Sequence, residues 1–340
     1  MAAVDSGFVF RSPFYVDLDS MSIIVSMLLI SRGVEFSGLF SRLSVQLLSL
    51  ARSPRLLAVV LILAVELSSA VLMNDTSLFI FLPFLLALSR VASIDVELMA
   101  VLVTIAANVG SSLTPIGNPQ NIIIWGHYGV GFFEFAAFMA PLVAFASLVL
   151  IVATCLSFRE TKIATRPPPP VVLDRRLLAV SLVLFALLLA ALRTVYVPLV
   201  VVACFVAMLA VRREIVFKVD YALILMFVFM FMDFREISLL LAGHVSLISG
   251  MEVLVFSALL SQAISNVPAT ITLLGHVSSW RPLALGVNIG GVGLVTGSMA
   301  NLITLRLTGL DINKFHRYSI PFFATLLAFF LLLFRLGIYP

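Results

Sequence analysis

Charged side chains are scarce in this sequence. Asp, Glu, Lys and Arg make up 11% of the 340 residues, whereas apolar types make up 62%. Soluble domains carry about 25% charged residues, so the composition excludes an ordinary soluble fold. It predicts an all-α polytopic membrane protein, because apolar stretches of about 20 residues can cross a bilayer as helices. The formal net charge of +4 requires no nucleic-acid partner, since basic residues also orient membrane proteins.

Cysteine is also rare, with only Cys155 and Cys204, each within an apolar stretch. Two such residues form at most one disulfide and fit no metal-binding spacing, which excludes a disulfide scaffold and a zinc site. No HExxH motif and no phosphate-binding loop occurs, which argues against an enzyme and against a transporter that hydrolyses ATP itself. We therefore expect no enzymatic activity and no cofactor other than Na⁺ or H⁺ as a coupling ion.

What the sequence does contain is a polar stretch inside apolar surroundings, NVGSSLTPIGNPQN at 108–121. Its two prolines lack the N–H that a helix needs, and its two glycines permit unusual backbone angles. The stretch therefore predicts a break within a helix spanning about 97–125. In a membrane, unwound backbone is tolerated only where it is buried in protein or lines a cavity, and transporters use such breaks to bind ions and substrates.

A second stretch repeats this pattern 180 positions later, where 288–301 reads NIGGVGLVTGSMAN. Without a gap, five of the eighteen positions 108–125 are identical to their counterparts, against roughly one or two expected by chance. Upstream, NDT at 74–76 and SNVP at 265–268 each close a long apolar run and are related by an offset of 192. The chain is therefore predicted to contain two repeats, each with a helical hairpin followed by a broken helix.

The lengths of the apolar stretches and the polar turns between them define the segments of the chain. A basic, proline-rich linker at 159–176 separates two halves, and a short extracytoplasmic lead at 1–19 precedes the first. Repeat 1 is predicted over 20–158, and its parts are a helix at about 20–40, a hairpin at about 56–88, a broken helix at about 97–125 and a helix at about 132–158. Repeat 2 is predicted over 177–338, and its parts are helices at about 177–192, 195–211 and 220–242, a hairpin at about 252–274, a broken helix at about 282–305 and a last helix at about 318–336.

The basic residues indicate how this layout is oriented. If the linker at 159–176 is cytoplasmic, fifteen of the 21 Lys and Arg residues fall on that side, as the positive-inside rule expects. The hairpins then enter from opposite sides, so the repeats are inverted and both termini are extracytoplasmic. We expect a multi-pass protein of the cell (plasma) membrane.

The breaks and hairpin tips supply the candidate binding residues. Helix N-termini at these points carry unpaired N–H groups and the positive end of the helix dipole, which suit an oxyanion. The hydroxyl, amide and backbone oxygens there are hard ligands for a small cation. The candidate substrate- and ion-binding residues of repeat 1 are Asn74, Asp75, Thr76, Asn108, Gly110, Ser111, Thr114, Gly117, Asn118 and Asn121. Those of repeat 2 are Ser265, Asn266, Asn288, Gly290, Thr296, Ser298 and Asn301.

Asp75 is the one carboxylate at a hairpin tip. An ionisable group inside a membrane protein marks a functional site by default, here as a cation ligand or a proton carrier. The alternative is a cap for the helix that follows, and the two roles are compatible. A candidate Na⁺ site is therefore placed at Asn74, Asp75 and Thr76 together with the break at 110–118.

Three further charged residues lie within apolar stretches. Arg32 and Glu35, spaced i, i+3, can pair on one helix face, either as a packing contact or as part of a site, and we favour packing. Glu66 lies about two turns before the first hairpin tip and is either a site residue or a partner within the fold.

Four motifs, NDTSLFIFLP, NVGSSLTPIGNPQN, SNVPATITLL and NIGGVGLVTGSMAN, resemble the ion transporter superfamily, which holds arsenite permeases, sodium/proton antiporters and citrate and divalent-anion transporters. The resemblance covers about residues 20–338. It implies two re-entrant hairpins, two broken helices, a scaffold part and a moving transport part, often in a dimer. It also implies sodium sites at the hairpin tips, but the second tip has Val267 where a threonine would be a ligand.

Together these features predict a secondary active transporter, or permease, of a small inorganic or organic anion, coupled to Na⁺ or H⁺ and working by an elevator-type or rocking mechanism. The alternatives are a sodium/proton antiporter of the same superfamily and, from another class, a passive anion channel. The expected partners are the anionic or oxyanion substrate, the lipid bilayer and a second copy in a homodimer, with no nucleic acid.

Overall fold

The structure, a computed structural model, describes residues 8–39, 42, 53–89, 95–158, 172–192, 194–241 and 250–339. Within this part of the chain every regular element is a helix, which confirms the all-α prediction. Three of these helices are long and apolar enough to cross a membrane, namely α4 (Pro54–Val71), α8 (Phe132–Ser157) and α17 (Ile312–Arg335). Most of the linker predicted at 159–176 lies outside the described residues.

The described residues form a series of consecutive helices. Those of the first half are α1 (Phe8–Arg11), η1 (Ser12–Tyr15), α2 (Leu18–Phe36), α4, α5 (Asn74–Ser89), α6 (Val96–Ser111), α7 (Pro119–Tyr128) and α8. Those of the second half are α9 (Arg175–Ala191), α10 (Val197–Arg212), α11 (Glu214–Phe217), α12 (Tyr221–Leu241), α13 (Gly250–Ile264), α14 (Asn266–Leu273), α15 (Trp280–Gly290), η2 (Val295–Gly297), α16 (Met299–Thr308) and α17.

Two helices begin earlier than the apolar stretches predicted, because a capping residue precedes each of them. Asp17 accepts hydrogen bonds from two backbone N–H groups at 3.1 and 3.2 Å, so α2 begins at Leu18, inside the predicted lead. Asp311 accepts two at 2.9 and 3.2 Å, so α17 begins at Ile312 rather than at about 318. A side-chain oxygen at the cap satisfies N–H groups that have no partner within the helix. The lead predicted at 1–19 also contains α1 and η1, so part of it is helical.

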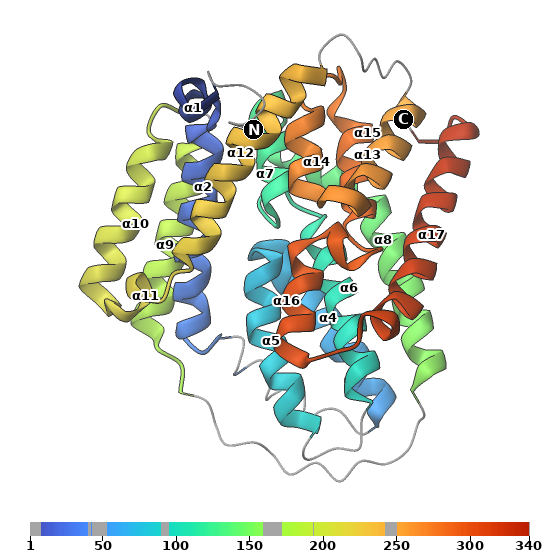
Figure 1. Cartoon of the computed structure of the whole chain (residues 1–340). Helices are drawn as coiled ribbons and strands as arrows, with labels where there is room; N and C mark the ends of the chain where they lie inside the picture. Colours follow the sequence, from blue (N-terminus) through green and yellow to red (C-terminus); the bar gives the residue numbers. More distant parts are fainter. Residues whose placement is uncertain are drawn as a thin grey trace.

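Figure 1 shows two groups of helices. α2, α9, α10 and α11 form a bundle on one side, α4 to α8 and α13 to α17 form a larger group beside it, and α12 lies across the boundary. Within the larger group, α4 and α5 occupy the lower half of the view, and α13 and α14 occupy the upper half. The turns that separate α6 from α7 and α15 from α16 lie near mid-height.

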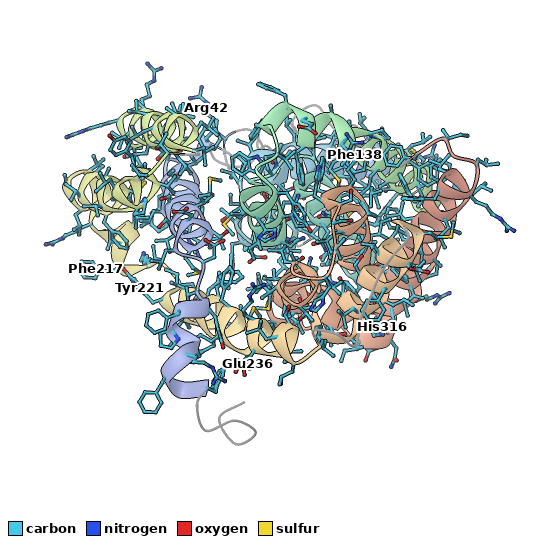
Figure 2. The ribbon with its side chains drawn as sticks, turned by 90° about the horizontal axis from the view of Figure 1, so that it is seen from above. Arg42, Phe138, Phe217, Tyr221, Glu236 and His316 are labelled. Carbon is cyan, nitrogen blue, oxygen red and sulfur yellow. The ribbon has the colours of Figure 1, made fainter. Side chains whose placement is uncertain are left out.

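The N-terminal turns pack against α12. Arg11 Nη2 lies 3.3 Å from Glu236 Oε1, and Figure 2 shows the Glu236 side chain beside this segment. Because Glu236 is only 4% exposed, the ion pair gives a buried carboxylate a partner of opposite charge. The start of the described chain is thereby joined to a helix 225 positions later.

α6 and α15 are buried along almost their whole length, which places the breaks at their ends inside the larger group. A glycine lets each of them approach a hairpin helix closely. A Cβ at Gly110 would lie 2.2 Å from the backbone oxygen of Glu66 on α4, and one at Gly290 would lie 2.6 Å from that of Ala258 on α13. Small residues commonly permit such contacts between membrane helices. The two contacts are equivalent, since the offsets of 180 and 192 carry Gly110 onto Gly290 and Glu66 onto Ala258.

Candidate functional site

Two pairs of asparagines join the helix breaks at the centre of the larger group. Asn108 Nδ2 donates to Asn301 Oδ1 at 3.0 Å, and Asn288 Nδ2 donates to Asn121 Oδ1 at 2.7 Å. Each pair links the last turn of the helix before one break to the first turn of the helix after the other. The four side chains are at most 4% exposed. The 180-residue offset carries Asn108 onto Asn288 and Asn121 onto Asn301, so the two pairs join equivalent residues reciprocally.

The asparagines that follow the breaks also satisfy the unwound backbone. Asn121 Nδ2 donates to the carbonyl oxygen of Thr114 at 3.0 Å, and Asn301 Nδ2 donates to that of Leu294 at 2.9 Å. The acceptor lies seven residues upstream in both cases. Buried carbonyl groups outside a helix need such partners, because leaving one unpaired costs about 1–3 kcal/mol. These amides therefore hold each break in its observed conformation.

A threonine in each break binds the neighbouring hairpin. Thr114 Oγ1 donates to the carbonyl oxygen of Ala70 on α4, and Thr296 Oγ1 donates to that of Gln262 on α13, both at 2.6 Å. The acceptors are separated by the 192-residue offset of the hairpin tips, whereas the two threonines lie 182 positions apart, two more than the offset of the breaks, so the contacts are similar but their donors are not matched residues. Each break is thus attached to the hairpin of its own half of the chain.

Asn74, at the first hairpin tip, completes the attachment to the first break. Its backbone N–H donates to the carbonyl oxygen of Gly117 at 3.0 Å, and its Nδ2 donates to Asn108 Oδ1 at 3.3 Å. Asn74 is 3% exposed, so both contacts are shielded from solvent. The tip, the break and the asparagine pairs therefore form one hydrogen-bonded network.

The helices that follow the breaks begin at polar caps. Asn118 accepts from the N–H of Asn121 at 2.9 Å at the start of α7, and Ser298 accepts from the N–H of Ala300 at 3.3 Å at the start of α16. The network and its close contacts include most of the predicted site residues, namely Asn74, Asn108, Gly110, Ser111, Thr114, Gly117, Asn118, Asn121, Asn288, Gly290, Thr296, Ser298 and Asn301.

Three polar residues of the network were missed from the sequence. Ser112 Oγ and Gln120 Nε2 both donate to Asn288 Oδ1, at 3.0 and 3.4 Å. Gln262 donates through Nε2 to the carbonyl oxygen of Gly290 and accepts through Oε1 from the N–H of Leu294. Ser112 and Gln120 lie within the polar stretch of the first break and could have been selected there. Gln262 lies in an otherwise apolar helix. An amide side chain is uncommon in such a stretch, and this was the one feature of the sequence that could have marked it as a site residue.

Asp75 and Thr76 lie apart from the network. Their side chains line a cavity of about 10 Å³ that faces α2 and the start of α12, whereas the adjacent Asn74 faces the break. Asp75 is 3% exposed, and its Oδ1 accepts no hydrogen bond from any described residue. The set predicted for a Na⁺ site is therefore divided between two places, with Asn74 at the break and the other two residues at this cavity.

The second hairpin tip has a different geometry. Ser265 has a φ of 78°, a left-handed conformation that is uncommon for a residue with a side chain. Its Oγ has no hydrogen-bond partner in the part of the chain that the structure describes. Asn266 packs against the second break, since a Cβ at Gly291 would lie 2.9 Å from its Nδ2. The two tip residues therefore border the network without the hydrogen bonds that Asn74 makes.

Glu66 faces away from the break. Ser147 Oγ on α8 donates to its Oε2 at 2.9 Å, and its Oε1 has no partner among the described residues. Its backbone, rather than its carboxylate, is what contacts Gly110. Arg32 and Glu35 form the predicted i, i+3 pair, with Nη1 and Oε2 2.8 Å apart.

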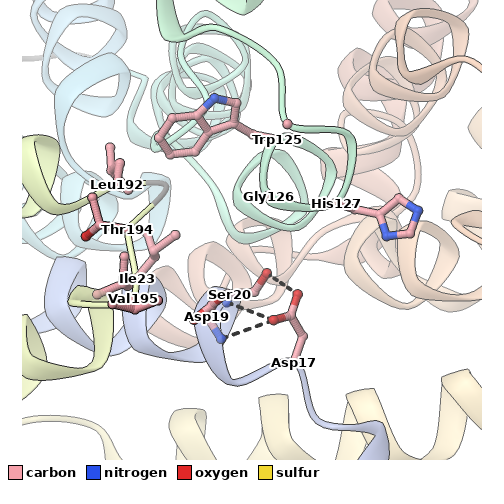
Figure 3. A pocket seen from close by; sticks show the side chains of 12 residues that line it. Asp17, Asp19, Ser20, Ile23, Trp125, Gly126, His127, Leu192, Thr194 and Val195 are labelled. Atoms are coloured by element: carbon pink, nitrogen blue, oxygen red, sulfur yellow. Dashed lines mark hydrogen bonds between the residues drawn. The ribbon is translucent and has the colours of Figure 1, made fainter.

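A cavity with a volume of about 340 Å³ lies between the two helix groups. Trp125 and His127 of α7 line it on one side, and Asp17, Ser20 and the turn between α9 and α10 line it on the other (Figure 3). None of the predicted site residues lines this cavity. The cavity is therefore lined by α7 and the bundle, which also contact each other directly, and not by the asparagine network.

Comparison with known proteins decides the family. The model of the citrate transporter family matches residues 7–280, which is more than half of the chain. The chain belongs to the citrate transporter family. This assignment confirms the resemblance to the ion transporter superfamily, and the protein is accordingly a helical membrane transporter.

The names of similar proteins are consistent with this family assignment. The chain is 38% identical to the inner membrane protein YbiR of Escherichia coli (strain K12) over 321 residues, 91% of this chain and 85% of that protein. It is 35% identical to the uncharacterized transporter MJ0456 of Methanocaldococcus jannaschii over 272 residues, 78% of this chain and 74% of that protein. It is 24% identical to the silicon efflux transporter LSI3 of Oryza sativa subsp. japonica over 167 residues, 49% of this chain and 34% of that protein.

Proposed function

We propose that this protein is a non-enzymatic secondary active permease of a small oxyanion or related oxyacid, coupled to Na⁺ or H⁺, with one central site built by two inverted repeats. The reciprocal asparagine pairs, Asn108 with Asn301 and Asn288 with Asn121, carry this proposal. In transporters, discontinuous helices that meet near the middle of the membrane form the substrate site. The two breaks of this chain meet near mid-height of the molecule (Figure 1).

The arrangement of the hairpins supports the inverted repeats. α4 and α5 lie in the lower half of Figure 1, whereas α13 and α14 lie in the upper half, as expected if the two hairpins enter a membrane from opposite sides. The similar bonds of Thr114 and Thr296, each to the hairpin of its own half of the chain, support the same relation. An elevator-type or rocking movement of the larger group against the bundle would then alternate the access to the breaks, and the cavity of about 340 Å³ lies at that boundary.

The chemistry of the network favours a small, hydroxylated substrate. Its described side chains are amides and hydroxyls, which both donate and accept, and none is a lysine or an arginine. The three carboxylates of citrate would lack cationic partners there, whereas an oxyanion can bind the N–H groups and dipoles at the starts of α7 and α16. A hydroxylated oxyacid can also replace the bonds that the asparagines now make to one another. The name of LSI3, a silicon efflux transporter, agrees with such a substrate.

Transport by purified protein in proteoliposomes tests this proposal. Preloaded arsenite, silicic acid, sulfate or citrate should drive counterflow of the same labelled solute, and Asn121→Ala should reduce the rate at least tenfold. Counterflow with citrate alone would contradict the oxyanion preference. Flux without counterflow or saturation would indicate the passive channel, and Na⁺/H⁺ exchange without any of these solutes would indicate the antiporter.

A further inference from the structure

Two helices outside the second break hold consecutive N–H groups of its unwound backbone. The N–H of Leu294 donates to Gln262 Oε1 on α13, and the N–H of Val295 donates to His316 Nε2 on α17 at 3.0 Å. Val295 is 7% exposed, so its N–H depends on a partner from the protein. The ring of His316 supplies that partner, which brings a titratable side chain into direct contact with the break.

The contact of His316 has no counterpart in the first half of the chain. The 180-residue offset carries Val295 onto Pro115, which has no N–H, and His316 onto Ala136, which has no polar side chain. The asparagine pairs and the threonine bonds join both halves or occur in each, whereas this contact belongs to one half. The histidine is therefore not needed to build a break of this kind, and it adds a property that only the second break has.

Protonation of the ring removes this contact. A ring nitrogen accepts a hydrogen bond only in neutral imidazole, whereas both nitrogens of the imidazolium are donors. In the charged ring, Nε2–H and the N–H of Val295 would therefore point at each other. Histidine changes its charge between about pH 5 and 8, so ordinary changes of pH switch such a contact. His316 is partly exposed and lies before the stretch at about 318–336 that the sequence predicts to span the membrane, so protons from the aqueous phase can reach it.

The charged groups around His316 leave a charge on its ring unpaired. α17 packs against α6, α13, α15 and η2. The titratable and charged groups on these elements are, on α17 and at its cap, Asp311, Lys314, Arg317, Tyr318 and Arg335, and on the others Glu97 of α6, Glu252 of α13 and Arg281 of α15. Glu97 is bound by Lys314 Nζ at 2.6 Å, and Glu252 and Arg281 lie in the first turns of their helices, roughly 13 Å or more from the break along the helix axis. Among the described residues no carboxylate forms an ion pair with His316, so protonation would exchange its bond to the break for an unpaired charge.

We propose that His316 is a positioning residue of the second break, which it holds while its ring is neutral and releases when its ring is protonated. The effect on transport rests on the proposed function. Asn301 Nδ2 donates to the carbonyl oxygen of Leu294 at 2.9 Å, and Asn108 Nδ2 donates to Asn301 Oδ1 at 3.0 Å. Release of Val295, the residue after Leu294, therefore disturbs one of the two asparagine pairs. Acidification then lowers the population of the conformation in which the two breaks are joined.

Hydrogen exchange of the purified full-length protein in nanodiscs, without substrate, tests this role. The readout is the exchange rate of peptides that cover the second break, at about pH 5.5 and about pH 8, with each rate corrected for the intrinsic effect of pH. In the wild type the corrected rate should be roughly tenfold higher at the lower pH, because the N–H of Val295 loses its acceptor. His316→Gln keeps an acceptor oxygen but does not titrate, and His316→Ala has no acceptor, so both should lose the pH dependence. His127→Gln, which removes a histidine that lines the cavity of about 340 Å³, is the matched control and should keep it.

The same corrected rate at both pH values in the wild type would overturn the proposal. So would a monodisperse His316→Gln or His316→Ala variant that keeps the wild-type pH dependence, or a His127→Gln variant that loses it. The exchange assay does not depend on transport. The expected exchange without counterflow would therefore refute only the proposed function, whereas counterflow with pH-independent exchange would refute only the role of His316.

Discussion

Substitution of Gly110 by alanine tests whether α6 must touch α4 at the point where the first break begins. The added Cβ would lie 2.2 Å from the backbone oxygen of Glu66, 2.5 Å from its Cα and 2.6 Å from its carbonyl carbon. Carbon atoms in contact are normally about 3.5–4.0 Å apart. Because all three neighbours are backbone atoms, no change of rotamer relieves the overlap. One helix must move by about 1 Å, and Asn108 would move with α6 relative to Asn301.

The expected cost follows from two opposing effects. Overpacking of a close-packed interior costs about 1–3 kcal/mol, and contact with rigid backbone places this site at the upper end. Alanine has a higher helix propensity than glycine, and this difference stabilises the helix by about 1 kcal/mol. We therefore expect a net loss of about 2 kcal/mol in the free energy of unfolding, together with slower transport, because the asparagine pairs are displaced. Gly290→Ala, which meets Ala258 on α13 in the same way, should have a similar effect.

Thermal unfolding in detergent and counterflow in proteoliposomes measure the two consequences. Gly126→Ala on α7 is the control, because its Cβ would meet only Ser20 Oγ, at 3.4 Å. The control should keep the wild-type Tm, whereas Gly110→Ala should lower it by several degrees. If Gly110→Ala has the Tm and the transport rate of the wild type, the close approach of α4 and α6 described above is wrong.

The remaining predictions concern the network, coupling and topology. Asn121→Ala and Asn301→Ala should each destabilise the fold by about 1–3 kcal/mol and by similar amounts, since each removes an amide that donates to the unwound carbonyls of its own break; clearly unequal losses in thermal unfolding would argue against their equivalence. Asp75→Asn should abolish uptake driven by a sodium or pH gradient but spare counterflow, and unchanged gradient dependence would remove its coupling role. Single cysteines at 159–176 should react with impermeant reagents only from the cytoplasm and those at 243–250 only from outside; labelling of both from one side would contradict the inverted layout.

Local sequence was sufficient for the features that depend on the backbone of a few residues. Two prolines and two glycines within twelve residues predicted a break in the first buried polar stretch, and α6 does end at Ser111, before Pro115 and Gly117. The spacing of Arg32 and Glu35 likewise sets their pairing on one turn of helix, and their side chains lie 2.8 Å apart. Such features need no knowledge of which helices become neighbours. The polar first turns of α2 and α17 were missed only because apolarity was the criterion.

Only the tertiary structure decided which polar side chains meet. The matched asparagines predicted a common site, but their reciprocal pairing between the two halves depends on how α6, α7, α15 and α16 pack. The adjacent residues Asn74 and Asp75 were predicted to belong to one Na⁺ site, yet one faces the break and the other faces α2 and α12. Consecutive residues of a helix point about 100° apart, so the direction of each side chain has meaning only once its neighbours across the fold are in place.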